Sequence, residues 1–76
     1  MNDKRSLRDL NPGQRGRVTA QRGGGPMRRR LRDIGLVEGT TVTCVGRSPM
    51  GDPTAFLIRG AVIALRGTDS GGVEIE

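Results

Sequence analysis

The chain has 76 residues and a formal net charge of +5, and 33% of its residues are hydrophobic. A chain this short buries only about 60% of its unfolded surface, so we expect one small domain over residues 1–76. It contains no His, Tyr or Trp, and its one cysteine is Cys44. This inventory argues against a disulfide framework, an activated nucleophile and a soft metal shell. We therefore expect a binding protein that is no enzyme and carries no metal or other cofactor.

Positive charge is concentrated in the first half of the chain. Residues 1–32 carry ten Lys or Arg and two acids, a net of +8, whereas residues 33–76 carry three Arg and six acids, a net of −3. Such asymmetry is typical of a nucleic-acid or acidic-protein partner, and also of a solvated arginine-rich surface. Nucleic acid is disfavoured because Phe56 is the one aromatic residue available for stacking. The sequence shows no signal peptide or spanning run, which predicts a cytoplasmic protein without membrane insertion.

The first expected elements are a turn and a strand. Pro12-Gly13 supplies turn chemistry, and the alternating residues 15–22 predict a short strand with Val18 and Ala20 on one face. Three consecutive glycines at 23–25 predict a connector without regular structure.

Residues 26–36, "PMRRRLRDIGL", predict a helix of about two turns. Pro26 suits its first position. Gly35 suits a left-handed residue just past its end, from which Leu36 would fold back onto Leu31 in a Schellman motif. The apolar stripe of this helix comprises Met27, Leu31 and Ile34.

The remaining apolar segments predict strands. Residues 41–47 alternate, with Val42 and Cys44 on one face. Residues 54–59 and 61–66 form a hairpin through Arg59-Gly60. A two-residue turn would place Phe56 opposite Ile63 and Leu57 opposite Val62, and a glycine bulge would shift this register by one. Both strands are apolar on two faces, so we expect cover on both sides. Residues 73–76 resemble an edge strand, with Val73 and Ile75 on one side and Glu74 and Glu76 on the other.

About five short strands and one short α-helix in so small a chain indicate a mainly β fold that closes into a small barrel, since closure removes exposed edges. The expected core residues are Val18, Leu31, Ile34, Leu36, Val42, Phe56 and Ile63.

Four ordered segments, taken together, resemble the ferrous iron transport protein A family (FeoA). They are "LNPGQRGRV" at Leu10–Val18, "LRDIGLVEGTTV" at Leu31–Val42, "SPMGDP" at Ser48–Pro53 and "ALR" at Ala64–Arg66. The match extends over nearly the whole chain with the family's order and spacing. The chain departs from the family pattern at the glycine-rich entry to the helix, Gly23–Pro26, and in the helix's arginine run.

The resemblance implies an SH3-like barrel and a cytosolic accessory protein that acts with the membrane G-protein ferrous iron transporter, FeoB. It does not imply iron binding by this chain. Capture of proline-rich peptides is disfavoured, because that mode uses an aromatic groove. The residues expected to bind the partner are Arg28, Arg29, Arg32, Met50 and Gly51.

Several alternatives remain open at the level of sequence. The chain could be a free-standing relative of the SH3-like domain of metal-dependent repressors, or a basic nucleic-acid-binding domain. Met50 either projects from its loop or folds over the barrel's end. Arg66 is expected to bond nearby carbonyls or Asp69. A weak homo-oligomer could form through the Val73–Ile75 edge, although Glu74 and Glu76 blunt that edge.

Overall fold

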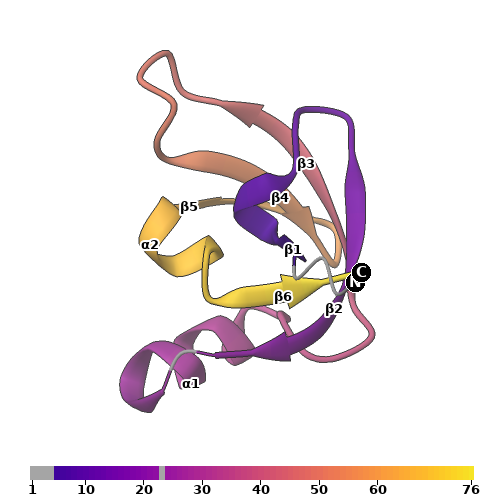
Figure 1. Cartoon of the computed structure of the whole chain (residues 1–76), viewed down its shortest axis with the longest axis vertical. Coiled ribbons are helices and arrows are strands. Elements are labelled where there is room, and N and C mark those ends of the chain that lie inside the picture. Colours follow the sequence, from indigo (N-terminus) through magenta and orange to yellow (C-terminus); the bar gives the residue numbers. More distant parts are fainter. Residues whose placement is uncertain (1–4, 23) are drawn as a thin grey trace.

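A computed structural model describes residues 5–22 and 24–76, and its elements are mainly strands (Figure 1). Of the expected glycine connector, Gly23 lies outside the described residues. The elements in chain order are β1 (Arg5–Ser6), the 3-10 helix η1 (Leu7–Asp9), β2 (Arg15–Gln21), α1 (Gly25–Asp33), β3 (Thr41–Arg47), β4 (Thr54–Ile58), β5 (Ala61–Leu65), α2 (Gly67–Ser70) and β6 (Val73–Ile75).

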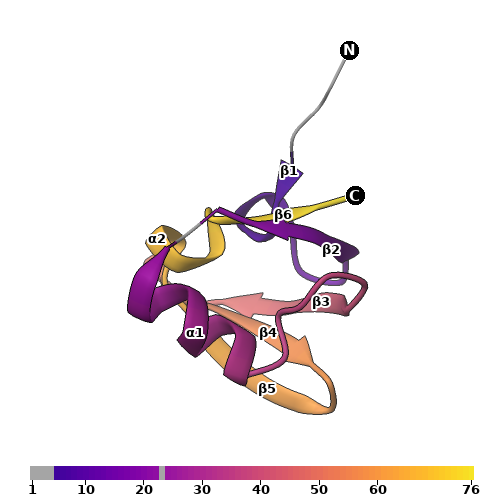
Figure 2. The same cartoon turned by 90° about the horizontal axis from the view of Figure 1, so that it is seen from below.

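All neighbouring strands pair antiparallel, in the order β1-β6-β2-β3-β4-β5. β2 joins two halves of the sheet, because its residues 15–17 pair with β3 and its residues 18–21 pair with β6. The sheet therefore curls around one core, with α1 beside it (Figure 2). The expected mainly β barrel with a short helix is confirmed. β1 and α2 are additional elements of two and four residues, too short to have a sequence signature.

A β-bulge in β2 changes which of its side chains face inward. The register with β6 shifts between Val18 and Ala20. Val18 is buried whereas Ala20 is exposed, so the prediction that both occupy one face was wrong. The extra residue of a bulge interrupts the alternation on which that prediction rested.

Helix α1 ends as its sequence predicts. Gly35 has a φ of +102°, Gly35 N–H donates to Arg32 O at 3.0 Å, and Leu36 N–H donates to Leu31 O at 3.0 Å. These two bonds define a Schellman motif, which is confirmed. The apolar stripe is buried at Leu31, but Met27 is 38% exposed at the start of the helix.

The β4–β5 hairpin has the two-residue turn and the register expected. Phe56 lies opposite Ile63 and Leu57 opposite Val62, while Arg59 and Gly60 both have positive φ, as a tight hairpin turn requires. The prediction of cover on both faces was wrong. Leu57 is 39% and Val62 63% exposed, because the packed elements all contribute to the core on the other face of the hairpin.

β6 is not an edge strand. It lies between β1 and β2, with Arg5 opposite Ile75 on one side and Val18 opposite Ile75 on the other. The edge prediction was wrong because the two-residue β1 carries no strand signal in the sequence. Since β6 is paired on both sides, it is not the free edge that was suggested for a homo-oligomer. Of the expected core residues, the structure buries Val18, Leu31, Leu36, Val42 and Phe56, and packs the partly buried Ile34 and Ile63 against them.

Candidate functional site

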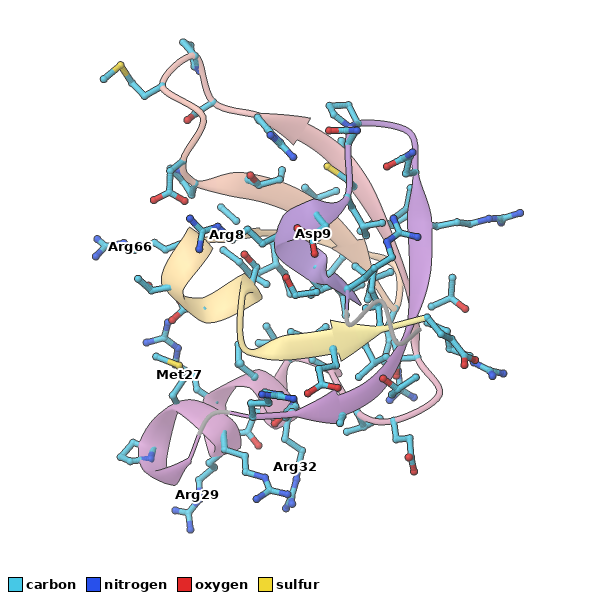
Figure 3. All side chains as sticks on the ribbon, viewed as in Figure 1. Arg8, Asp9, Met27, Arg29, Arg32 and Arg66 are labelled. Atoms are coloured by element: carbon cyan, nitrogen blue, oxygen red, sulfur yellow. The ribbon has the colours of Figure 1, made fainter. Side chains whose placement is uncertain are left out.

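The outer side of α1 carries a cluster of arginines. Arg28, Arg29 and Arg32 are exposed, and Figure 3 shows Arg29 and Arg32 extending away from the barrel. Within residues 5–22 and 24–76, none of these three forms an ion pair, whereas Arg30 pairs with Asp69 at 3.5 Å. Arg28 lies in the first turn of α1, where a cation opposes the helix dipole, whereas Arg32 lies in the last turn, where a cation is favourable. We call Arg28, Arg29 and Arg32 the arginine surface.

A groove of about 350 Å³ runs between α1 and β2, beside the arginine surface. Arg28 and Arg32 lie four positions apart on α1 and both line this groove. The side-chain amide of Gln21 donates to the carbonyl oxygen of Leu36 and so ties β2 to the chain beyond the helix. Guanidinium groups bind carboxylates through charge-assisted hydrogen bonds, so the groove suits acidic side chains. Its lining residues are Thr19, Ala20, Gln21, Arg28, Arg32, Leu36, Val37 and Glu38.

The loop between β3 and β4 holds Met50 in solvent. Gly51 N–H donates to Ser48 O at 2.8 Å, and Ser48 N–H donates to Pro53 O at 3.1 Å, so the loop is closed by its own backbone. Met50 is 89% exposed at its tip. Of the two arrangements left open by the sequence, the structure therefore has the projecting one.

Asp52 links this loop to the start of α2 (Gly67–Ser70), which follows β5. Its Oδ1 accepts a hydrogen bond of 2.6 Å from Gly67 N–H, the first residue of α2. The carboxylate thus acts as an N-terminal cap supplied by another part of the chain. Sequence analysis missed this contact because the two residues are 15 positions apart and α2 was not expected.

Arg66 does not play its expected role. Its side chain is exposed and points away from the barrel (Figure 3), and the Asp69 carboxylate pairs with Arg30 instead. Asp69 is 6% exposed, and its carboxylate faces Arg30 of α1 rather than Arg66.

The expected partner-binding residues do not converge on one site. The arginine surface lies on α1 at one end of the longest dimension, and the loop that carries Met50 and Gly51 lies at the other (Figures 1 and 3). The molecule is 31 Å along that dimension. Two separate contact surfaces are therefore available to a partner.

Two observations concern metal ions and membranes. Among the described residues, no three His, Cys, Asp or Glu side chains gather where they could hold a metal ion, and Cys44 is buried. None of the helices in this part of the chain is long and apolar enough to cross a membrane.

Comparison with known families gives a match over nearly the whole chain. A sequence model described as the FeoA domain matches residues 5–76. A curated relative from Porphyromonas gingivalis, an Fe(2+) transport protein A/Fe(2+) transporter FeoB fusion protein, is 31% identical over 70 residues. That alignment includes 92% of this chain, which spans 8% of the relative's length.

Solved structures show the same fold. The FeoA-like protein from Clostridium acetobutylicum is 29% identical with a TM-score of 0.89, over 100% of this chain and 88% of that one. FeoA of Stenotrophomonas maltophilia, described as a prokaryotic SH3 domain protein, is 25% identical with a TM-score of 0.84, over 95% and 89% of the two chains. The SH3-like fold is thereby confirmed. A manganese-dependent transcriptional repressor, 18% identical over 42% of its chain, shares the fold alone, with a TM-score of 0.86.

Proposed function

The chain belongs to the FeoA domain family, and from that premise we propose that it is a non-catalytic accessory protein of ferrous iron uptake. It acts in the cytoplasm by binding the cytosolic part of a FeoB-type transporter. The relative in which the two proteins form one chain supports this pairing, because fusion keeps two interacting domains at a high effective concentration.

The arginine surface is the proposed main contact. The observation that carries this assignment is the presence of three exposed arginines on one short helix without an acidic partner in the described chain. Arg28 and Arg32, four positions apart on α1, repel each other, whereas an acidic partner surface would find a preformed set of guanidinium donors. Net charge of this sign also steers acidic partners toward the protein.

The exposed Met50 is the proposed second contact. An unbranched, polarizable side chain adapts to an apolar depression in a partner, and its loop is already closed by backbone hydrogen bonds. Little ordering cost would therefore accompany binding at this end of the molecule. Because the loop and α1 lie at opposite ends, a partner that uses both must extend along the molecule.

The test is a fluorescence anisotropy titration of labelled protein against the cytosolic region of its transporter, at two salt concentrations. Arg29→Gln/Arg32→Gln should weaken binding at least tenfold and flatten its salt dependence. The matched control, Arg5→Gln/Arg15→Gln, removes the same charge from exposed positions of β1 and β2 and should bind like the unmodified chain. Equal losses in both variants would contradict the arginine surface.

A DNA duplex titrated in parallel separates the accessory role from nucleic-acid binding. We expect little binding to the duplex at the higher salt concentration. Binding to DNA alone, with a steep loss on addition of salt, would overturn the proposed function. Removal of the gene should also lower ferrous iron uptake, and the restored gene should recover it, so normal uptake in its absence would count against the proposal.

A further inference from the structure

The outer edge of β5 presents backbone groups that no described strand uses. β5 ends the strand order and forms the outer margin of the molecule in Figure 2. The two-residue turn makes Ile58 and Ala61 a hydrogen-bonded pair, and such pairs alternate along an antiparallel ladder. The N–H and C=O groups of Val62 and Ala64 therefore face away from β4, and among the described residues neither makes a backbone hydrogen bond to another element.

β5 lacks the features that usually protect a sheet edge. Natural edge strands are kept short, bulged, or interrupted by proline and charge, which prevents pairing with another chain. Ala61–Leu65 is five residues long, contains neither proline nor charge, and pairs with β4 without a bulge. The opposite edge, β1, is two residues long. The β1 edge is thus too short to pair stably with another chain, while the β5 edge can accept a further strand.

The outer face beside this edge is apolar. Val62 on β5 is 63% exposed and Leu57 on β4 is 39% exposed. Val62 and Leu57 are register partners, so their side chains lie next to each other on this face. A strand added to β5 would place every second side chain on the same face of the sheet as Val62.

Arginines stand at both ends of the edge. Arg59 precedes β5 and Arg66 follows it, and both are exposed without an ion pair among the described residues. The strand between them, Ala61–Leu65, is about 13 Å long. If a second copy of this chain paired antiparallel through β5, Arg59 of each copy would lie beside Arg66 of the other. Opposed like charges at both ends disfavour that occupant and favour acidic groups there.

We propose that the β5 edge binds an extended segment of a partner protein that carries carboxylates at both ends and an apolar centre. The backbone of the segment pairs with Val62 and Ala64, its alternate apolar side chains pack on Val62 and Leu57, and its terminal carboxylates contact Arg59 and Arg66. This mode of binding is β-augmentation, in which backbone bonds supply affinity and side chains supply selection. The surface is separate from the arginine surface and does not require that the partner be a transporter.

The probe is a fluorescein-labelled peptide, Glu-Asp-Val-Thr-Val-Thr-Val-Asp-Glu, titrated with the full chain. Val62→Pro removes one N–H that faces away from β4, so the pairing of β5 with β4 is kept. Circular dichroism and thermal unfolding establish that this variant is folded. We expect its affinity for the peptide to fall at least tenfold, and we expect the peptide to slow amide exchange at Val62 and Ala64 in the unmodified chain.

A second variant tests the charged ends of the edge without introducing a proline into β5. Arg59→Asn/Arg66→Gln should weaken peptide binding about fivefold and reduce its salt dependence. Asn tolerates the positive φ at position 59, so the turn is retained. Arg5→Gln/Arg15→Gln, the charge-matched control, should leave the affinity unchanged.

Four results would overturn the proposal. The first is absence of saturable binding to the unmodified chain, and the second is unchanged binding in a folded Val62→Pro variant. The third is a loss caused by Arg29→Gln/Arg32→Gln in place of the β5 variants, which would assign the peptide to α1. The fourth is a dimer in analytical ultracentrifugation that Val62→Pro abolishes, which would make a second copy the occupant of the edge.

Discussion

The two faces of the β4–β5 hairpin carry side chains of similar hydropathy and meet opposite environments. Phe56 is fully buried and its register partner Ile63 packs against the core, whereas the adjacent pair of Leu57 and Val62 is exposed. The difference comes from the curl of the sheet, since η1, α1 and the other strands add their apolar side chains to the core on one face of the hairpin only. Apolar residues on both faces of a strand therefore indicate a surface that can be covered, by the chain itself or by a partner.

The largest expected effect comes from the buried face. Phe56→Ala should lower the free energy of unfolding by about 3–5 kcal/mol, because it removes a large buried side chain and leaves a cavity. Against a total of about 5 kcal/mol for so small a domain, much of the population would unfold. Urea unfolding followed by circular dichroism measures the change. Leu57→Ala on the other face should cost less than about 1 kcal/mol, and equal losses at the two positions would break the comparison.

Helix α1 provides the same contrast on a second element. Leu31→Gln should cost about 2–5 kcal/mol, since it strips the helix of its core contact and buries an amide. Met27→Gln, four positions earlier and 38% exposed, should cost less than about 1 kcal/mol. Thermal unfolding of the two variants compares them directly. Normal melting of Leu31→Gln would show that α1 contributes little to the barrel.

An intermediate loss of stability is expected at the open end of the hairpin, where Asp52 caps α2. Asp52→Ala removes the cap on Gly67 N–H and should cost about 1 kcal/mol. Asp52→Asn retains an acceptor oxygen and should recover most of this loss. Unfolding in urea gives both values. Equal stability of the alanine variant and the unmodified chain would mean that α2 keeps its position without the cap.

The smallest effect on stability is expected on the exposed face. Leu57→Thr/Val62→Thr keeps β-branched or strand-compatible side chains and should change the free energy of unfolding by no more than about 0.5 kcal/mol per site. The same variant should weaken binding of the acidic peptide, because its apolar contacts are lost. A large fall in melting temperature would show that the exposed face stabilises the domain as the buried face does, which would contradict the difference described above.

Local chemistry accounts for what the sequence predicted well. The Schellman end at Gly35 depends on a glycine directly after an apolar stripe, and the register of Phe56 with Ile63 depends on the adjacent Arg59-Gly60 turn. Each is decided within a few residues of chain. The resemblance to the FeoA family, which rests on four ordered segments, predicted the SH3-like fold, and the spacing of apolar residues predicted a core that the structure buries or packs against.

Contacts between distant segments account for the rest. The cap from Asp52 to Gly67 and the ion pair between Arg30 and Asp69 connect residues 15 and 39 positions apart. The exposure of Val62 depends on which face of the hairpin the other elements cover, and the central position of β6 depends on a two-residue strand. The arginines of the candidate site could be listed from the sequence, but their separation from Met50 along the molecule required the fold.

The pairing of β1 with β6 has a mechanical consequence. Arg5 lies opposite Ile75 and Ser6 opposite Glu74, so the chain leaves this antiparallel pair from the same end on both strands. Tension applied between the two ends of the domain would load the hydrogen bonds of this pair one after another, as in the opening of a zipper, and not all at once as in shear. A tether at one end alone would leave the pair unloaded. The domain should therefore resist stretching through both ends far less than it would if the same pair were loaded in shear, along the strands.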